Sequence, residues 1–366
     1  MARARGRPKL GLKNGLSFAQ TKTVKKTRWG TLCRGHMNHT ICINRLVLAS
    51  AAALCGLLFA ALVPAQQAWP ARPLRFLVPA PGGSSIDVVM RIIAGQLKDR
   101  LGQPIIVDNK PAAGGTVAAN EVARATADGY TFFVGFNGPL ANAPSLYSKL
   151  SYDPLKDLVP VILTGTQPNL LAVGATVAAG NLREFLALAR SQPGRLNYAS
   201  VGNGSSSHLS MELLKKQAGL DLTHVPFNGG PPATLAVVSG EVQVLFSAPA
   251  NLMPQVKAGK LRAIAVSSAK RFGPTGDIPT LAESGLPGFE ALAWNGVMAP
   301  AGTAPEVVLR LNREINAILA SPEVKKKLFD AYIEPGGGSS AAFGQLIRSE
   351  SIKWGEIIRL TGAKVD

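Results

Sequence analysis

Residues 74–101 read LRFLVPAPGGSSIDVVMRIIAGQLKDRL, which is the pattern of a strand, a glycine-rich turn and a helix in direct succession. The mostly apolar residues 74–78 predict a buried strand, and Gly82 and Gly83 fall in the turn. After the turn, apolar residues recur every three or four positions from Ile86 to Leu101, which is the spacing of one helix face. A strand joined to a helix by a short loop is the repeating unit of α/β folds with parallel sheets.

The same alternation of short strands and amphipathic helices continues along the chain. A second unit of this kind is YASVGNGSSSHL at residues 198–209, with Gly202 and Gly204 in its loop. Further strands are expected at residues 104–107, 130–134, 158–163, 170–173, 222–227, 242–247 and 261–266, and further helices at 116–127, after Asn181, after Thr303 and at 340–360. Because 366 residues exceed what one core usually carries, we predict two α/β lobes with mainly parallel sheets around a ligand cleft.

Both glycine-rich loops present groups that suit a bound anion. Each precedes a helix, and a helix N-terminus offers unpaired N–H groups and a partial positive charge to a carboxylate or phosphate. No Lys follows the glycines of the second loop, and Ser207 stands where a dinucleotide fingerprint needs a third glycine. The loops therefore predict an anion site without a nucleotide, shared between the two lobes. Taken singly, either loop could equally be a tight turn that only starts a helix.

Candidate catalytic and metal-binding side chains are sparse. All three Cys lie before residue 56, and His208 and His224 are the only His after residue 45. We therefore predict no catalytic residue, no metal site and no cofactor. An exported serine hydrolase with Ser205 or Ser206 as nucleophile and His208 as base is the enzymatic alternative, although no G-x-S-x-G elbow is present.

The first 68 residues differ from the rest of the chain. Residues 1–45 hold eleven of the 39 Lys and Arg and none of the 22 Asp and Glu, so most of the net charge of +17 lies there. The uncharged run LVLASAAALCGLLFAALV at residues 46–63 follows, and small residues come after it. This order predicts a basic extension and a secretory signal peptide cut near Ala65 or Ala68, and hence a periplasmic protein. We expect translation to begin at Met37, and no nucleic-acid partner.

Several short motifs, taken together, resemble the Bug-type periplasmic solute-binding receptors of the tripartite tricarboxylate transporter family. The motifs are VPAPGG at residues 78–83, VDNKPAAGG at 107–115, ADGYT at 127–131, LNYAS at 196–200, VPF at 225–227, DIPT at 277–280 and APAGT at 299–303. The resemblance covers residues 69–366 in order.

The resemblance implies a type II periplasmic-binding-protein fold that closes on a small carboxylated solute. It implies a first part of lobe 1 at residues 69–167, lobe 2 at 168–289, and a return to lobe 1 with the C-terminal helices at 290–366. The implied function is delivery of a small organic acid to the membrane permease subunits of a tripartite transporter, by a monomeric receptor. A sensor-type binding protein for a signalling system is the alternative within this family reading.

The resemblance and the loop chemistry together give an expected set of ligand-binding residues. They are Pro81, Gly82, Gly83, Ser84, Asp87, Asn137, Gly138, Ser200, Gly202, Gly204, Ser205, Ser206 and Phe227. One departure bears on the ligand: where relatives often supply an Asp at a strand end, this chain reads FSAP at residues 246–249. We therefore expect an aromatic or plain aliphatic acid that lacks a cationic amine at that end.

Overall fold

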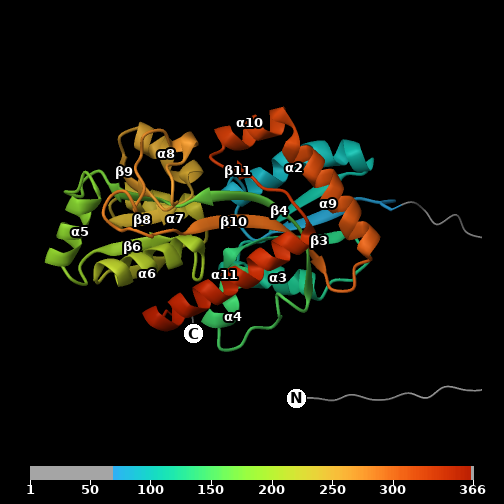
Figure 1. Cartoon of the computed structure of the whole chain (residues 1–366), viewed down its shortest axis with the longest axis horizontal. Coiled ribbons are helices and arrows are strands. Elements are labelled where there is room, and N and C mark those ends of the chain that lie inside the picture. The colour runs from blue at the N-terminus through green and yellow to red at the C-terminus, as the bar shows by residue number, and fades with distance from the viewer. Residues whose placement is uncertain (1–68, 364–366) are drawn as a thin grey trace, which may run out of the picture. The chain divides into compact units, whose positions relative to one another are not determined.

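The computed structural model describes residues 69–363, in which the chain forms two β-sheets flanked by helices (Figure 1). The expected basic extension and signal peptide at residues 1–68 lie outside the described residues. Within the described range, no helix combines the length and the apolar composition that a bilayer crossing requires.

The first sheet has six strands in the order β11-β4-β10-β3-β1-β2. These strands are β1 (Leu74–Val78), β2 (Ile105–Asn109), β3 (Thr131–Phe136), β4 (Leu158–Pro168), β10 (Leu292–Pro300) and β11 (Glu334–Pro335). The helices in the same stretches of chain are α2 (Ser85–Leu101), η1 (Ala113–Gly115), α3 (Thr116–Ala123), η2 (Gly138–Asn142), α4 (Ala143–Leu146), α9 (Pro305–Ala320), α10 (Pro322–Asp330) and α11 (Ser340–Thr361).

The second sheet has five strands in the order β7-β6-β8-β5-β9. These strands are β5 (Leu170–Gly174), β6 (Asn197–Ser200), β7 (Thr223–Pro226), β8 (Val244–Ser247) and β9 (Leu261–Val266). The helices between them and after them are α5 (Leu182–Ser191), α6 (Ser206–Ala218), α7 (Gly230–Val238), α8 (Pro249–Lys257) and η3 (Gly273–Thr275).

The two sheets share one plan, and this plan confirms the expected α/β class. Each sheet contains three parallel strands of which the first in the chain lies between the other two: β1 lies between β2 and β3, and β6 lies between β7 and β8. The expectation of mainly parallel sheets needs correction, because β10, β5 and the outer strands β4, β9 and β11 pair antiparallel. The parallel strands are linked through helices, whereas β4 and β5 follow each other with only Asn169 between them.

The chain passes twice between the sheets. It leaves the first sheet at the end of β4 and returns to it as β10, which pairs with β4 over almost its full length. Helix α11 then packs against β4 and η2 of the first sheet and against α6 of the second. The lobe boundaries expected at 167/168 and 289/290 stay predictions.

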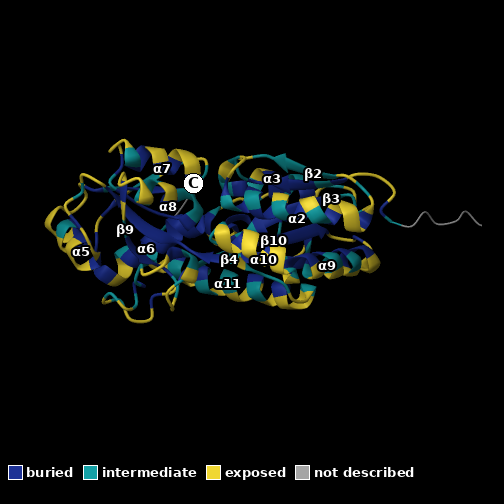
Figure 2. Ribbon diagram, turned by 90° about the horizontal axis from the view of Figure 1, so that it is seen from above, coloured by how far each residue is buried: buried dark blue, intermediate teal, exposed yellow. Residues whose placement is uncertain are grey.

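Apolar side chains pack on both faces of each sheet, and most strand residues are buried, which Figure 2 shows in dark blue. In β1, Leu74, Phe76 and Val78 pack with α2 and α9, whereas Leu77 points to the opposite face and packs with Phe133 and α3. This alternation follows from the two-residue period of a strand. Because both faces are buried, the strands read as nearly continuous apolar runs in the sequence.

Candidate functional site

The ends of six parallel strands and the loops that follow them meet around one cavity. These strands are β1, β2, β3, β6, β7 and β8, and ligands bind at this end of the strands in open α/β sheets. The wall is formed by residues 79–81, 84–86, 111, 112, 114, 115, 136, 137, 167, 169, 201, 202, 205, 206, 227–230, 247, 248, 251 and 293–295. The space open to the centre of a water molecule is about 110 Å³. One water needs roughly 10–15 Å³ on this measure, so a small organic acid has room.

Five helices begin at the cavity wall. The residues that precede their first turns all line it: Ser84 before α2, Gly115 before α3, Ser205 before α6, Gly229 before α7 and Ala248 before α8. The first N–H groups of a helix have no partner inside that helix and carry a partial positive charge. The cavity therefore lies in a field that favours a negative charge.

The N-terminus of α2 presents donors without partners. Ser84 is extended, caps no N–H group with its side chain, and has a buried hydroxyl without a hydrogen-bond partner among the described residues. The neighbouring Ser85 hydroxyl accepts a hydrogen bond from Nε2 of Gln167 at 3.0 Å, so its own proton is free to donate. The Oε1 atom of Gln167 is also buried and unpartnered. A buried polar group without a partner is unfavourable, so this wall is suited to a polar ligand.

Three of the expected residues in this turn lie behind the wall. Gly82 and Gly83 do not line the cavity, and Gly83 has a φ of +79° that shapes the turn. Asp87 is 2% exposed, and its carboxylate accepts hydrogen bonds from Gly83 N, Arg91 and Asn109 at 2.9–3.0 Å. Burial alone raises the pKa of Asp87, but these hydrogen bonds outweigh burial and hold that pKa below its usual value. The Asp87 carboxylate thus holds the turn between β1 and α2 in place from the protein side and does not contact the cavity.

The N-terminus of α6 faces the same cavity. Ser205 and Ser206 line it, and so does Gly202 with a φ of +136°. The Ser205 hydroxyl accepts from the backbone N–H of His208 at 3.3 Å and donates to Gly202 O at 2.7 Å. Neither serine hydroxyl has an imidazole nitrogen among its hydrogen-bond partners in the described residues, so the arrangement of a serine hydrolase is not assembled here.

Gly204 and Ser200, two expected residues of the second loop, form hydrogen bonds with imidazole rings. Gly204 donates its N–H to Nδ1 of His208 at 3.1 Å, and the Ser200 hydroxyl lies 2.7 Å from Nε2 of His224. Neither Gly204 nor Ser200 lines the cavity. Burial lowers the pKa of His208 to about 4, with the nearby Lys215 as the second cause. The ring is therefore neutral at neutral pH and can accept this hydrogen bond.

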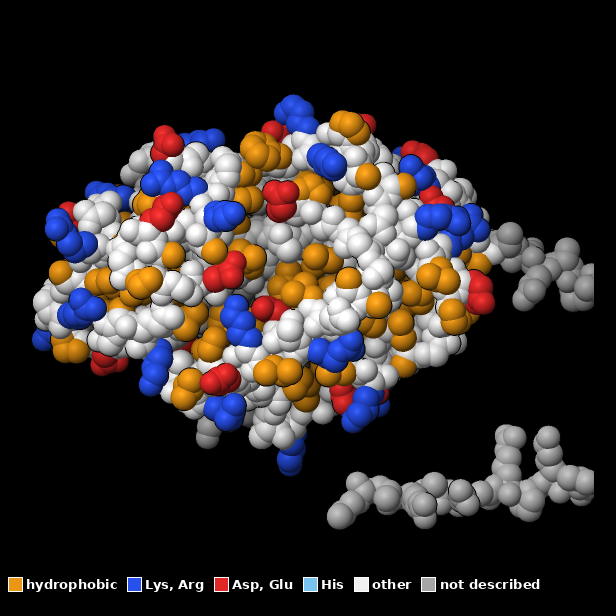
Figure 3. Space-filling model, viewed as in Figure 1, with side chains coloured by type: hydrophobic (Ala, Val, Ile, Leu, Met, Phe, Trp, Pro, Cys, Tyr) orange, Lys and Arg blue, Asp and Glu red, His pale blue; other side chains and the backbone are white. Residues whose placement is uncertain are grey.

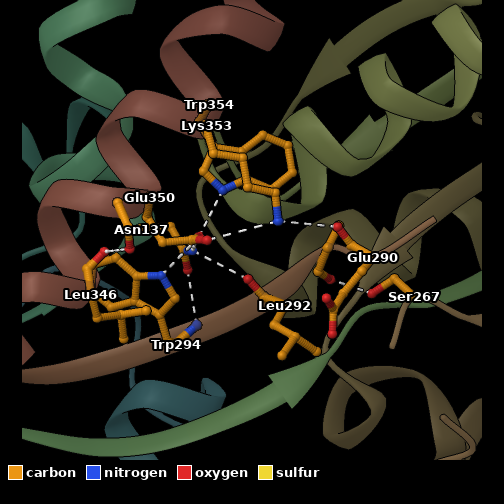
Figure 4. A network of polar contacts seen from close by, with 11 residues as sticks. Asn137, Ser267, Glu290, Leu292, Trp294, Leu346, Glu350, Lys353 and Trp354 are labelled. Carbon is orange, nitrogen blue, oxygen red and sulfur yellow. Dashed lines mark hydrogen bonds and ion pairs between the residues drawn. The ribbon is translucent and has the colours of Figure 1, made fainter. Parts of the chain in front are cut away.

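The remaining wall is aromatic and amide-rich. Phe136, Phe227 and Trp294 line it, whereas Gly138 does not. Asn137 lines the cavity, yet its side chain is engaged within the protein: Oδ1 accepts from Trp294 N at 2.9 Å, and Nδ2 donates to Leu292 O at 3.2 Å (Figure 4). Sequence reasoning placed Asn137 at the wall but not in this network.

No charged residue lines the cavity, within the part of the chain that the structure describes. Neutral hydroxyl, amide and N–H groups at helix N-termini can hold an anion without leaving an unpaired cation when the site is empty. The same described residues contain no group of three or more His, Cys, Asp or Glu side chains placed to hold a metal ion.

Several polar wall residues are not in the expected set of ligand-binding residues. They are Ser85, Gln167, Asn169, Asn228, Ser247 and Asn251. Ser85 follows Ser84 within the same turn, so the motif itself was a signal. Gln167 and Asn169 flank the crossing between the sheets, where no local pattern marks a site.

Comparisons with known proteins agree with this geometry. The sequence profile described as "Tripartite tricarboxylate transporter family receptor" matches residues 89–363. Protein BugT of Bordetella pertussis is 35% identical over 298 residues, which cover 81% of this chain and 91% of BugT. A Rhodopseudomonas palustris protein solved with adipate is 36% identical, with a TM-score of 0.78 over 80% of this chain and 98% of that chain. MatC from Rhodopseudomonas palustris, solved with bound malate, is 35% identical, with a TM-score of 0.75 over 79% of this chain and 100% of that chain.

Proposed function

We propose that this chain, which belongs to the tripartite tricarboxylate transporter family of receptors, captures a small organic acid in the cavity between α2 and α6 and delivers it to a membrane permease. One observation carries the proposal. The N-termini of α2 and α6, which follow strands of different sheets, both present N–H and hydroxyl donors to one cavity. No charged residue lies in the described wall of this cavity. The structures of relatives with adipate and with malate support a carboxylate as the ligand.

The energetics favour a carboxylate held by several neutral donors. A micromolar dissociation constant corresponds to about −8 kcal/mol. One helix terminus contributes roughly 0.3–1 kcal/mol, and up to about 2 kcal/mol in a buried geometry. Hydrogen bonds from Ser84, Ser85 and Ser206 to a charged oxygen then add about 1.5–3 kcal/mol each. Burial of the hydrocarbon part of the ligand against Phe227 and Trp294 supplies the rest.

The wall also favours an acid without an amine. No Asp or Glu lines the cavity in the described chain, so a cationic amine would lose its water without gaining a counter-charge. The first turns of α7 and α8 contain Pro231, Pro232 and Pro249, which lack N–H groups, and this leaves that end poorer in donors than the end at α2 and α6. We infer a ligand with one strongly bound carboxylate and a plain aliphatic or aromatic body.

Export and surface charge fit this role. The predicted signal peptide would bring the mature chain to the periplasm, where we expect it to act as a monomer. On the face in Figure 3, Lys and Arg side chains are interspersed with Asp and Glu, so that face has no broad basic patch of the kind that binds nucleic acid. Delivery to a sensor instead of a permease is the alternative use of the same cavity.

Native mass spectrometry of the freshly purified protein tests the proposal. We expect one small acid per chain, released on unfolding, and a dissociation constant in the micromolar range or tighter by calorimetry. The titration panel is adipate, malate, succinate, benzoate and aspartate, with aspartate as the amine-bearing member that we expect to bind most weakly. Absence of binding by folded protein to every acid, or ester hydrolysis that is lost in Ser205→Ala, would refute the assignment.

A further inference from the structure

A single carboxylate oxygen outside the cavity gathers three N–H groups. Oε2 of Glu350, on α11, accepts hydrogen bonds from Nε1 of Trp354 at 2.8 Å, Nε1 of Trp294 at 3.1 Å and Nδ2 of Asn137 at 3.3 Å (Figure 4). The Glu350 side chain is 15% exposed and does not line the cavity. It is therefore a largely buried acceptor whose partners come from three separate segments of the chain.

Two of these three donors belong to the cavity wall. Asn137 follows β3, Trp294 lies on the crossing strand β10, and both line the cavity. Asn137 also accepts the backbone N–H of Trp294, so the two wall residues and Glu350 form a closed ring of hydrogen bonds. The orientations of the Trp294 indole and the Asn137 amide are thus set by a group on the far side of the wall.

The same ring connects to the anion-binding loop of α6. Asn137 is the residue before η2, and Asn142 at the end of η2 donates its side-chain N–H to Gly204 O at 2.6 Å. On the other side, Lys353 lies 3.8 Å from Glu350 and donates to Glu290 O at 3.3 Å in the segment that leads into β10. Because α11 packs against both β4 and α6, it joins segments of both sheets.

We propose that Glu350 is a positioning residue for ligand binding, which acts by holding Trp294 and Asn137 in the orientation that shapes the cavity wall. This inference rests on the proposed function for its binding readout, and it goes beyond that function because Glu350 touches no ligand. Loss of the carboxylate leaves three buried N–H groups without their acceptor. The Trp294 indole is then free to turn, and the Asn137 amide keeps only its hydrogen bonds to Trp294 N and Leu292 O, so the shape of the space that the acid occupies changes.

The variants Glu350→Ala and Glu350→Gln test this role, with Glu356→Gln as the matched control. Glu356 lies on the same helix and is exposed, and its side chain makes no hydrogen bond or ion pair in the described chain. We expect the dissociation constants for adipate and malate to rise at least tenfold in Glu350→Ala and about threefold in Glu350→Gln, whose amide oxygen still accepts. In Glu356→Gln they should stay within twofold of the wild-type values.

A spectroscopic readout separates positioning from simple loss of stability. In protein labelled with 5-fluorotryptophan, the fluorine resonance of Trp294 is assigned from a Trp294→Phe variant. We expect one sharp line in the wild type and in Glu356→Gln, and a broadened or split line in both Glu350 variants without ligand. Trp354→Phe removes one donor to Glu350 but leaves the wall intact, so it should lower the melting temperature while the adipate affinity stays within threefold.

The outcomes decide the two proposals separately. Unchanged affinity and an unchanged Trp294 line in folded Glu350→Ala overturn the positioning role. If Glu350→Ala does not fold, the same criteria apply to Glu350→Gln. If the wild type binds no acid, the proposed function fails, and the Trp294 line alone then decides whether Glu350 fixes the wall.

Discussion

The imidazole rings of His208 and His224 stack with their centroids 4.1 Å apart and their planes 7° from parallel. Tyr198 stacks on His224 with a centroid distance of 4.7 Å, and its hydroxyl donates to Glu212 at 2.5 Å. Lys215 pairs with the same Glu212 oxygen at 2.8 Å. The anion-binding loop of α6 therefore rests on two imidazoles that lie close to one cation and one carboxylate.

This stack makes stability depend on pH. Burial is the main cause that lowers the pKa of His208 to about 4 and that of His224 to about 3, from an ordinary value of 6.5. Lys215 also lowers both values, whereas Glu212 raises that of His224. As the pH falls below 6.5, the unfolded chain binds protons that the folded chain does not. The free energy of unfolding should therefore fall from pH 6.5 towards pH 4, by up to about 3 kcal/mol for His208 alone. Urea denaturation at pH 7, 6 and 5, above the main range of carboxylate titration, measures this fall.

His208→Asn is the control for the pH dependence. Asn does not titrate, and its oxygen can accept the N–H of Gly204 in place of Nδ1. We expect a smaller fall between pH 7 and pH 5 in this variant than in the wild type. Equal slopes in both proteins would show that His208 does not cause the pH dependence.

The unpartnered hydroxyl of Ser84 gives a second prediction. Ser84→Ala removes a buried hydroxyl that bonds to nothing in the described chain, so the stability of the ligand-free protein should stay the same or rise slightly. Affinity for adipate should fall about tenfold or more, since a hydrogen bond to a charged oxygen is worth about 1.5–3 kcal/mol. Calorimetric titration and thermal unfolding measure the two effects.

Ser321→Ala is the matched control for Ser84→Ala. Ser321 also precedes a helix in an extended conformation, and its side chain also caps no N–H group, but it lies outside the cavity wall. Its replacement should leave the affinity unchanged. Equal affinities in all three proteins would mean that the Ser84 hydroxyl does not reach the ligand.

A third prediction concerns the contact between the loops of the two sheets. Gly114, in the loop after β2, has a φ of +62°, and a Cβ there would lie 2.7 Å from the carbonyl oxygen of Asn203. Gly102 has a similar φ of +66°, but a Cβ there meets nothing within 4 Å. Left-handed strain of about 1–2 kcal/mol should therefore lower the stability of both Gly→Ala variants, and the clash with Asn203 should add to this loss in Gly114→Ala.

Only Gly114→Ala should also weaken ligand binding. Its methyl group forces the Asn203 carbonyl away and keeps the two loops apart beside the cavity, so we expect at least a tenfold rise in the dissociation constant for adipate. Thermal unfolding and calorimetry of both variants provide the test. Comparable affinities in Gly102→Ala and Gly114→Ala would show that the contact does not matter for binding.

Local patterns in the sequence predicted most of the elements near the site. The strand expected at 74–78 matches β1, the strand at 261–266 matches β9, and α2 begins one residue before Ile86, where the expected helical spacing starts. The helix expected after Asn181 is α5, and Asn181 caps it by accepting the N–H of Glu184 at 3.0 Å. Hydrophobic periodicity and capping residues act over a few positions, so one sequence suffices to read them.

Features that depend on distant contacts could not be read in this way. Helix α8 was not expected, and it contains Pro254, which lacks the N–H group that a helix interior uses. Asp87 was expected to face the ligand, but Arg91 and Asn109 turn its carboxylate into the protein. Glu350 lies 213 residues from Asn137, so no spacing or motif connects them.

A fourth prediction concerns the end of the cavity at α7 and α8, where Ala248 can be replaced by a charged or a neutral residue. Ala248 lines the cavity directly before α8, where it caps no N–H group. Asp and Asn are both favoured at this position, so Ala248→Asp and Ala248→Asn should each raise stability by about 0.5–2 kcal/mol. Only the Asp variant adds a negative charge to the wall. At an effective dielectric of about 20, two like charges roughly 6 Å apart repel by about 3 kcal/mol.

Affinity for adipate should therefore fall at least tenfold in Ala248→Asp and stay within threefold in Ala248→Asn. Affinity for aspartate relative to adipate should rise in the Asp variant, because its carboxylate offers the amine a counter-charge that the natural wall lacks. Calorimetric titration of both variants with both acids measures these ratios. If the two variants weaken adipate equally, shape and not charge causes that loss. If the aspartate-to-adipate ratio is also the same in both variants, the neutral wall does not explain the preference for plain acids.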